Sequence, residues 1–272
     1  MQKQCLLLGL FSTFFLLPLA AQSDLCKMNI KGNVKLYKEV SYTDSCRLKE
    51  DICDLYIAFD ENGNRIVEAD YENGHVKGSS AFVYDTNGRV IAANEFHDDG
   101  TLYAISTFKY GNTGLLMEKK AEYLGETHYL RHTYSYDKND LLKEIVDFDE
   151  NNNLFKAITF SYDNRGKITE ERFYLPFGRL YSWKIFIYNN QGQLIEEQHY
   201  DARGFLYHSD LFFYDAHGNV KELQMRQFNA GLSDRNTYHY EYEYDQLGNW
   251  LCKKIYYNNK PLSVVERELE FF

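Results

Sequence analysis

Aromatic and aliphatic residues recur at fixed positions along most of this chain. Tyrosines follow one another at intervals of 26 residues, an aromatic residue stands two positions before each, and an aliphatic residue stands six positions after each. Side chains two apart on a β-strand point to the same face, so these columns predict the buried face of a series of strands. The tyrosine column is Tyr84, Tyr110, Tyr136, Tyr162, Tyr188 and Tyr214, and the aromatic column before it is Phe82, Phe108, Tyr134, Phe160, Phe186 and Phe212.

Each of these tyrosines opens a short polar turn of the form YDxxG, as in YDTNG (84–88) and YDNRG (162–166). The aspartate can accept hydrogen bonds from the turn backbone, and the glycine can adopt the left-handed conformation that closes a type I turn with a bulge. Asp140 stands in place of the glycine in one unit, which aspartate tolerates. A second, looser turn falls midway through each unit, as in YLPFG (174–178) and YDARG (200–204). Each unit is therefore predicted to be strand, turn, strand, turn.

About eight such units span residues 59–272. They predict an all-β fold of tandem 26-residue β-hairpin repeats, forming a long, twisted or coiled antiparallel sheet of about sixteen strands. The seventh unit carries a four-residue insertion within about 226–240, because Tyr244 follows Tyr214 after 30 residues. Residues 24–58 lack the repeat, and we expect them to cap the N-terminal end of the array.

The YDxxG core with its flanking aromatic residues resembles the YD repeats of bacterial Rhs-type proteins, over about residues 59–272. In that family the repeats form a β-sheet strip that coils into a shell, and large members enclose a toxin domain in it. This chain has only about eight repeats and ends in a repeat-like strand at 267–272. We therefore expect an open, curved sheet rather than a closed capsule. A weaker resemblance is to MORN-like repeats, which have a shorter period.

The N-terminal residues have the pattern of a secretory signal peptide. Lys3 is followed by 12 mostly apolar residues at 6–17 and by small residues within 18–23. The apolar run is shorter than the roughly 20 residues of a transmembrane helix, and no other segment approaches that length. We expect residues 1–23 to be removed from a bacterial protein that has no membrane span and is periplasmic, displayed on the cell surface or secreted.

Four cysteines remain after this cleavage: Cys26, Cys46, Cys53 and Cys252. An even number in an exported protein permits disulfides, and three connectivities are open. Three of the four lie within residues 26–53, so we expect one pair there to staple the cap. Their spacing is not that of a zinc site, and we predict no metal.

The formal net charge of −10 argues against nucleic-acid binding, because an acidic surface repels phosphate. HExxH, GxSxG and glycine-rich phosphate-loop motifs are all absent from the sequence. Neighbouring acids such as Glu170 and Glu171 point to opposite faces of a strand, which makes them poor acid–base pairs. We therefore expect a non-enzymatic protein with no catalytic residue and no cofactor. A polysaccharide hydrolase, with a carboxylate pair assembled from different strands, is the alternative.

Five glutamates occupy the same position in successive units and would form an acidic stripe if the units stack in register. They either offer a surface to a cation or basic partner or, the interpretation we favour, form a solvated column paired with lysine and arginine. The five are Glu118, Glu144, Glu170, Glu196 and Glu222.

Aromatic residues outside the core columns are the best candidates for ligand binding. Tyr103, Tyr181 and Tyr207 share one position of the repeat, and Trp183 lies two residues beyond Tyr181. All four are predicted to share one face of the sheet, opposite to Phe186. If this face is exposed, it offers flat rings to a glycan or a protein; if the sheet curves strongly, both faces are partly buried.

The sequence therefore favours an exported interaction module that binds protein or glycan. A purely structural shell or spacer is a further alternative, and the oligomeric state stays open.

Overall fold

Eighteen antiparallel strands form one sheet in the computed structural model, which describes residues 23–42, 54–72, 74–125, 129–229 and 232–272. The strands are β1 (Val34–Tyr42), β2 (Leu55–Phe59), β3 (Arg65–Glu72), β4 (His75–Tyr84), β5 (Val90–Phe96), β6 (Leu102–Tyr110), β7 (Leu116–Tyr123), β8 (Tyr129–Tyr136), β9 (Leu142–Phe148), β10 (Leu154–Tyr162), β11 (Ile168–Leu175), β12 (Arg179–Tyr188), β13 (Leu194–Asp201), β14 (Leu206–Tyr214), β15 (Val220–Asn229), β16 (Leu232–Tyr244), β17 (Trp250–Tyr257) and β18 (Lys260–Phe271). Two short helices accompany them, α1 (Asp24–Lys27) and the 3₁₀ turn η1 (Pro176–Gly178).

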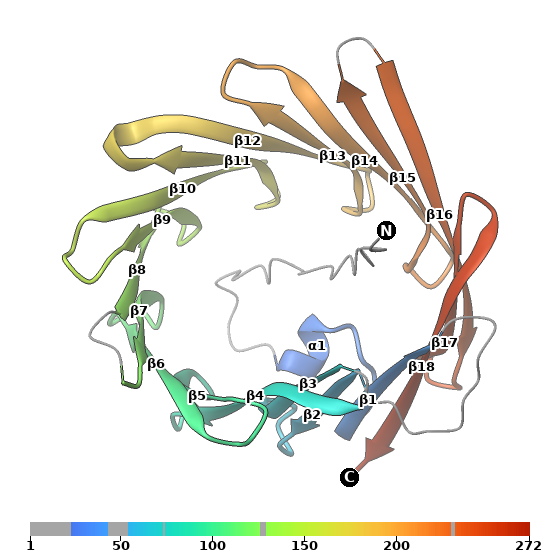
Figure 1. Ribbon diagram of the computed structural model, residues 1–272, viewed down its shortest axis with the longest axis horizontal. Helices are drawn as coiled ribbons and strands as arrows, with labels where there is room; N and C mark the ends of the chain where they lie inside the picture. Colours follow the sequence, from blue (N-terminus) through green and yellow to red (C-terminus); the bar gives the residue numbers. More distant parts are fainter. Residues whose placement is uncertain (1–22, 43–53, 73, 126–128, 230–231) are drawn as a thin grey trace.

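The all-β prediction of tandem hairpins is confirmed, but the sheet is closed into a barrel (Figure 1). The segment before the repeats supplies β1 and most of β2, and β1 pairs with both β2 and β18. The pairing with β18 runs from Val34 opposite Phe271 to Tyr42 opposite Val264. The expected open sheet was therefore wrong. Pairing of the first and last strands removes both sheet edges and satisfies their backbone groups.

The predicted turn chemistry is present in the YD-type turns. Asp163 Oδ1 accepts hydrogen bonds from the backbone N–H groups of Arg165 and Lys167, both at 2.9 Å. Gly166 closes the turn at φ 75°, and its N–H donates to the Asp163 carbonyl at 3.1 Å. Asp140 occupies the equivalent position at φ 61°, as the sequence predicted.

We expect Gly166→Ala to lower the free energy of unfolding by about 1–2 kcal/mol, because a Cβ is strained at this positive φ. Gly166→Asn should cost less, since Asp140 and Asn152 adopt the same conformation elsewhere in the chain. Urea denaturation measures both variants, with Asn164→Ala in the same turn as the control. Equal losses for alanine and asparagine would contradict the assignment of strain to the backbone.

The motif tyrosines also join successive hairpins to one another. In five of the six, from Tyr110 to Tyr214, the hydroxyl donates to the carbonyl of a residue 20 positions earlier, over 2.6–2.8 Å. Burial raises the pKa of Tyr162 to about 12, with the charges of Asp137 and Glu171 adding to the effect, so the hydroxyl stays protonated as a donor. The pairs are Tyr110–Val90, Tyr136–Leu116, Tyr162–Leu142, Tyr188–Ile168 and Tyr214–Leu194.

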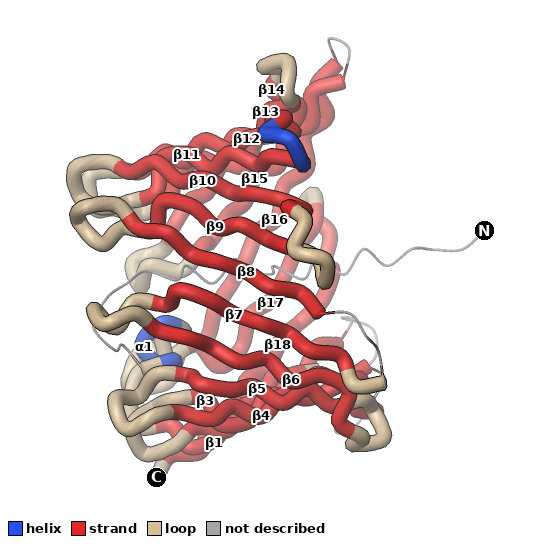
Figure 2. The backbone as a smooth tube through the Cα atoms, turned by 90° about the vertical axis from the view of Figure 1, so that its left-hand side faces the viewer, coloured by secondary structure: helices blue, strands red, loops and turns tan. Residues whose placement is uncertain are grey.

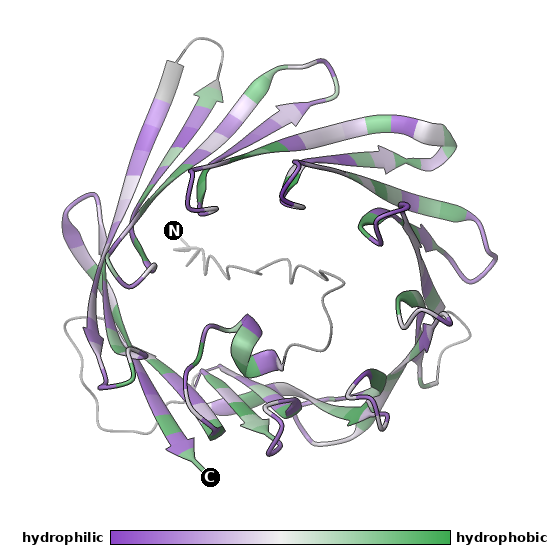
Figure 3. Cartoon of the chain, turned by 180° about the vertical axis from the view of Figure 1, so that it is seen from behind, coloured by the Kyte–Doolittle hydropathy of each residue, from purple (hydrophilic) through white to green (hydrophobic). Residues whose placement is uncertain are grey.

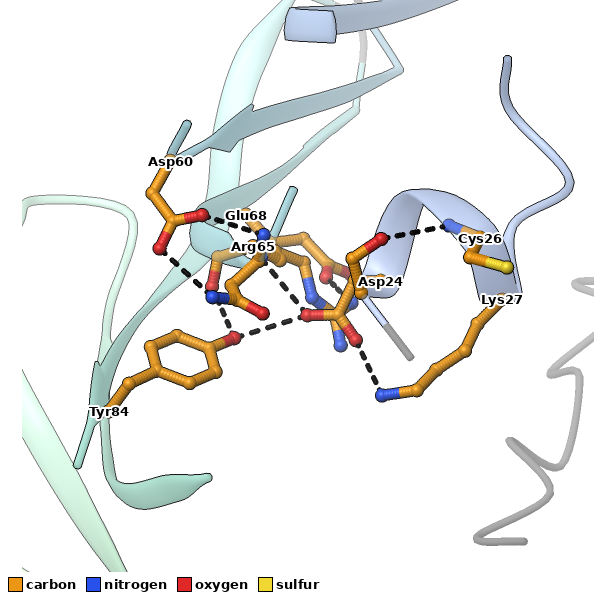
Figure 4. Close-up of polar contacts among 9 residues, drawn as sticks. Asp24, Cys26, Lys27, Asp60, Arg65, Glu68 and Tyr84 are labelled. Atoms are coloured by element: carbon orange, nitrogen blue, oxygen red, sulfur yellow. Dashed lines mark hydrogen bonds and ion pairs between the residues drawn. The ribbon is translucent and has the colours of Figure 1, made fainter. Parts of the chain in front are cut away.

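The position of α1 shows which face of the sheet lines the lumen. The helix lies inside the ring (Figure 1), where Leu25 packs with Ile57 and Phe59 of β2. Its Asp24 carboxylate accepts hydrogen bonds from the Tyr84 hydroxyl at 3.1 Å and the Arg65 backbone N–H at 3.0 Å (Figure 4). The face that carries the motif tyrosines therefore faces inward, and residues that alternate with them face outward.

The two kinds of turn lie at opposite rims, because consecutive turns of a meander alternate between the ends of its strands. Figure 2 shows η1, a second turn, at one rim, whereas α1 lies toward the other rim, beside the FDENG turn. The inserted residues lengthen β15 and β16, which extend beyond their neighbours (Figure 1). Hydrophilic and hydrophobic residues are interleaved along the strands (Figure 3). Among the described residues, no helix has the length and apolarity needed to cross a membrane.

Candidate ligand-binding site on the lumenal wall

The candidate tyrosines Tyr103, Tyr181 and Tyr207 lie at β-bulges next to the second turns. Phe173 pairs with Ser182 and the next residue, Tyr174, pairs with Leu180, so Tyr181 between them has no cross-strand partner in this ladder. The registers of the other two hairpins skip Tyr103 and Tyr207 in the same way. A bulge adds one residue to one strand and so changes which face the following side chains occupy.

The predicted grouping of Trp183 with these tyrosines is wrong. Trp183 is the cross-strand partner of Tyr200 and stacks on it, with ring centroids 5.1 Å apart, on the outer face. Tyr181 instead lines a hollow together with Ser182 and Lys184. These two residues alternate with Trp183 along β12 and therefore lie on the lumenal face. The bulge at Tyr181 therefore places two aromatic rings, two residues apart in sequence, on opposite faces.

Phe155 occupies the same position of the repeat and is likewise a bulge residue, between Leu154 and Lys156 in the register with β9. We call Tyr103, Phe155, Tyr181 and Tyr207 the bulge aromatics. The last three are 60%, 63% and 40% exposed, respectively. Phe155, Tyr181 and Tyr207 come from every second strand, β10, β12 and β14, and so recur about every 9.5 Å along this rim, whereas Tyr103 lies on β6, four strands before Phe155. The 26-residue interval between Phe155 and Tyr181 was the sequence signal that would have found Phe155.

Polar side chains of the lumenal wall surround the bulge aromatics. Tyr103 donates to Glu95 Oε2 at 3.0 Å and lies against the ring of His97. Asp147 is bound through its two oxygens by His132 Nδ1 at 2.7 Å and Lys156 Nζ at 3.1 Å. Burial opposes ionisation of Asp147, but these two partners outweigh it and hold the pKa of the carboxyl below its usual value.

The next lumenal group lies on β11, β12 and β13 and is dominated by carboxylates. Lys184 Nζ lies 2.9 Å from Glu197 Oε1. Burial would raise the pKa of Glu197, but the close contact with His199 and the charge of Lys184 lower it to about 2. Glu171 is 6% exposed, and burial raises its pKa, with Lys184 opposing this effect and Glu197 adding to it. One ammonium group therefore faces two buried carboxyls.

Two histidines and two acids form a square on β13 and β14, directly beyond Lys184. His199 is the cross-strand partner of His208, and Glu197 is the partner of Asp210. One ligand atom of each of His199, His208 and Asp210 lies within 4.8 Å of the other two, so these residues could hold a metal ion. Sequence reasoning missed this group. The sequence signal that would have found it is a pair of alternating motifs, Glu-x-His and His-x-Asp, on the two strands of one hairpin.

A hollow of about 300 Å³ opens beside Tyr181. Its lining is mostly apolar and includes Tyr181 and Phe173 together with Ser182, Lys156 and Lys184. Flat rings flanked by hydrogen-bonding groups suit a ligand with an apolar face and polar edges.

The glutamate column lies on the outer face, where Glu118 and Glu170 pair with cations and Glu196 and Glu222 accept hydrogen bonds from Gln198 and Gln224. Glu118 lies 2.6 Å from Lys109 and 3.5 Å from Arg131, and Glu170 pairs with Arg172. These ion pairs support the interpretation of a solvated column. The pKa of Glu118 is lowered mainly by its hydrogen bond to Lys109, against the opposing effect of burial.

The predicted disulfide staple stays a prediction. Cys46 and Cys53 lie outside the described residues. Cys26 is exposed on α1, and Cys252 is half-buried on β17.

Comparison with known proteins adds no family to this description. No family model matches the sequence, and no curated protein matches it. Among solved structures, a porin-like protein from Bacteroides uniformis is 13% identical with a TM-score of 0.45, and the match covers 87% of this chain and 98% of that one. TcdB2-TccC3 without its hypervariable C-terminal region is 9% identical with a TM-score of 0.30, over 78% of this chain and 16% of that one.

The Photorhabdus luminescens Tc holotoxin pore is 10% identical with a TM-score of 0.24, and this chain spans 16% of its matched chain. All three TM-scores are below 0.5, so these matches carry no inference about ligand or partner.

Proposed function

We propose that this protein is an exported bacterial interaction module, built of YD-type repeats, that binds a glycan without transforming it. The ligand lies along the second-turn rim of the lumenal wall and contacts the bulge aromatics in turn.

The observation that carries this proposal is the recurrence of exposed rings at bulges of alternate strands. Phe155, Tyr181 and Tyr207 stay solvent-exposed, whereas the aromatic columns of the motif are partly or fully buried. Their spacing of about 9.5 Å suits an extended chain of sugars. Lys156, Lys184 and Ser182 lie next to Tyr181 and can hydrogen-bond to hydroxyl or carboxylate groups of that chain.

A glycan array probed with the mature protein tests the proposal, followed by calorimetric titration of the best ligand. We expect Tyr181→Ala and Tyr207→Ala each to weaken binding by about 5–10-fold, because a ring contact contributes about 1 kcal/mol. Trp183→Ala is the matched control. It removes a larger ring from the same strand, but on the outer face, and should leave the affinity unchanged.

Three results would overturn the proposal. The first is equal loss of affinity in Trp183→Ala and Tyr181→Ala. The second is release of cleaved sugar during the titration, which would favour a hydrolase. The third is the absence of binding to every glycan on the array, together with specific capture of a protein from the native envelope.

A further inference from the structure

We propose that His199, His208 and Asp210 bind one divalent transition-metal ion of the Zn²⁺ class on the lumenal wall. This inference does not depend on glycan binding, because it rests on different side chains, although Tyr207 belongs to the same hairpin and its ring lies edge-on to His199.

The backbone places the three residues for joint ligation. His199 on β13 and His208 on β14 are direct cross-strand partners, and their rings lie edge to face with centroids 5.0 Å apart. Asp210 lies two residues beyond His208 and therefore on the same face. Because both strands belong to one hairpin, the site is assembled by a local and rigid element rather than by a loop.

The donor set fits a metal of this class. Two imidazoles and one carboxylate suit zinc and its neighbours in the first transition series, whereas Ca²⁺ and Mg²⁺ prefer oxygen alone. Ligand atoms in a tetrahedral zinc site lie about 3.4 Å apart, which follows from metal–ligand distances of about 2.1 Å. The three donors already lie within 4.8 Å of one another, so rotation of the side chains closes the remaining gap.

Two of the donor atoms lack a hydrogen bond that would explain their burial. His199 Nε2 and Asp210 Oδ1 are both buried, and neither has a hydrogen-bond partner among the described residues. His199 Nε2 lies 3.0 Å from Glu197 Oε1, and Asp210 Oδ1 lies 2.9 Å from His208 Nε2, but neither contact has hydrogen-bond geometry. Buried polar atoms are almost always satisfied, so both atoms point to a missing partner.

The charge around the hairpin favours a cation. Glu171 and Glu197 face one ammonium group, that of Lys184, and Asp210 adds a third carboxyl group as the cross-strand partner of Glu197. Lys184 already pairs with Glu197 at 2.9 Å, whereas among the described residues Asp210 has an ion-pair contact only with His208, itself a proposed ligand. Asp210 is the carboxylate left for the metal.

Titration of the tag-free mature chain with Zn²⁺ and Co²⁺, after chelator treatment and alkylation of its thiols, tests the site. We expect one equivalent to bind by calorimetry, with a Co²⁺ absorption spectrum free of thiolate bands, and Zn²⁺ to raise the melting temperature. Mg²⁺ should do neither. His199→Ala and His208→Ala should each abolish this equivalent.

His132→Ala is the matched control. His132 also lies on the lumenal face and contacts a carboxylate, Asp147, but belongs to no such group of three ligands among the described residues. Its removal should leave metal binding intact. If either alanine variant fails to fold, His199→Gln and His208→Gln replace it, since glutamine keeps most of the volume.

The proposal is overturned if the wild-type chain binds no equivalent of Zn²⁺. It is also overturned if folded His199 and His208 variants bind as the wild type does, or if His132→Ala abolishes binding to the same extent.

Discussion

Phe59→Ala is expected to lower the free energy of unfolding by about 3–5 kcal/mol, the largest effect of any substitution considered for this protein. The Phe59 side chain is 2% exposed and belongs to the cluster in which α1, β1 and β2 come together. Its neighbours there include Val34 and Tyr37 of β1, which are 0% and 1% exposed. Truncation leaves a cavity that these residues cannot fill without moving β1.

Because this cluster lies at the closure of the barrel, the substitution should destabilise more of the sheet than the residues around Phe59. β1 is the strand that closes the barrel against β18, so loosening it should expose both sheet edges. We therefore expect faster amide exchange in β1 and β18 as well as a lower urea midpoint, both measured on the mature chain.

Phe213→Ala is the control for Phe59→Ala. Phe213 lies on the outer face of β14 and is 42% exposed, and its loss should cost less than about 1 kcal/mol. Similar losses for the two phenylalanines would show that the cluster at the closure does not dominate the stability of the barrel.

Arg267→Ala is expected to cost about 2–4 kcal/mol. Arg267 Nε donates to Glu39 Oε1 at 2.9 Å across the β1–β18 seam, and the guanidinium carbon lies 3.1 Å from the centre of the Trp250 ring on β17. Both charged side chains are mostly buried, at 16% and 21% exposure. Removal of the arginine leaves the Glu39 carboxylate buried without this partner, which outweighs the lost contacts themselves.

A double-mutant cycle separates the charge from the packing. Arg267→Ala combined with Glu39→Gln should recover part of the loss, because the amide costs less to bury than the carboxylate. Arg203→Ala is the surface control. Arg203 pairs with Asp201 at 2.8 Å but its side chain is 86% exposed, so its loss should be close to zero. Strict additivity of the Arg267 and Glu39 variants would contradict the proposed coupling.

Most of the local structure could be predicted from the sequence because it depends on residues close together in the chain. The 26-residue columns identified the strands and the side chains that share one face of each, and the YDxxG motif identified the turns, including the left-handed conformation of Asp140. Hydrophobic period and turn chemistry act over a few residues, so one unit is enough to show them.

The candidate site was predicted only in part, because a β-bulge is not visible in a strand pattern. Alternation alone placed Trp183 beside Tyr181, but the extra residue in the β11–β12 hairpin reverses the faces on one side of it. The histidine–aspartate group was missed for a related reason. His199 and His208 are nine residues apart in sequence, and only the register of β13 with β14 makes them partners.

The sequence by itself therefore determined the repeat, the turns and the columns that share one face of the sheet, which all follow from local propensity and period. Only the tertiary structure decided that the sheet closes. Glu39 and Arg267 come together from opposite ends of the chain, and their contact depends on the twist accumulated over all eighteen strands. The sequence pattern of one repeat does not show this accumulated twist, so it could not predict whether the two ends of the sheet would meet.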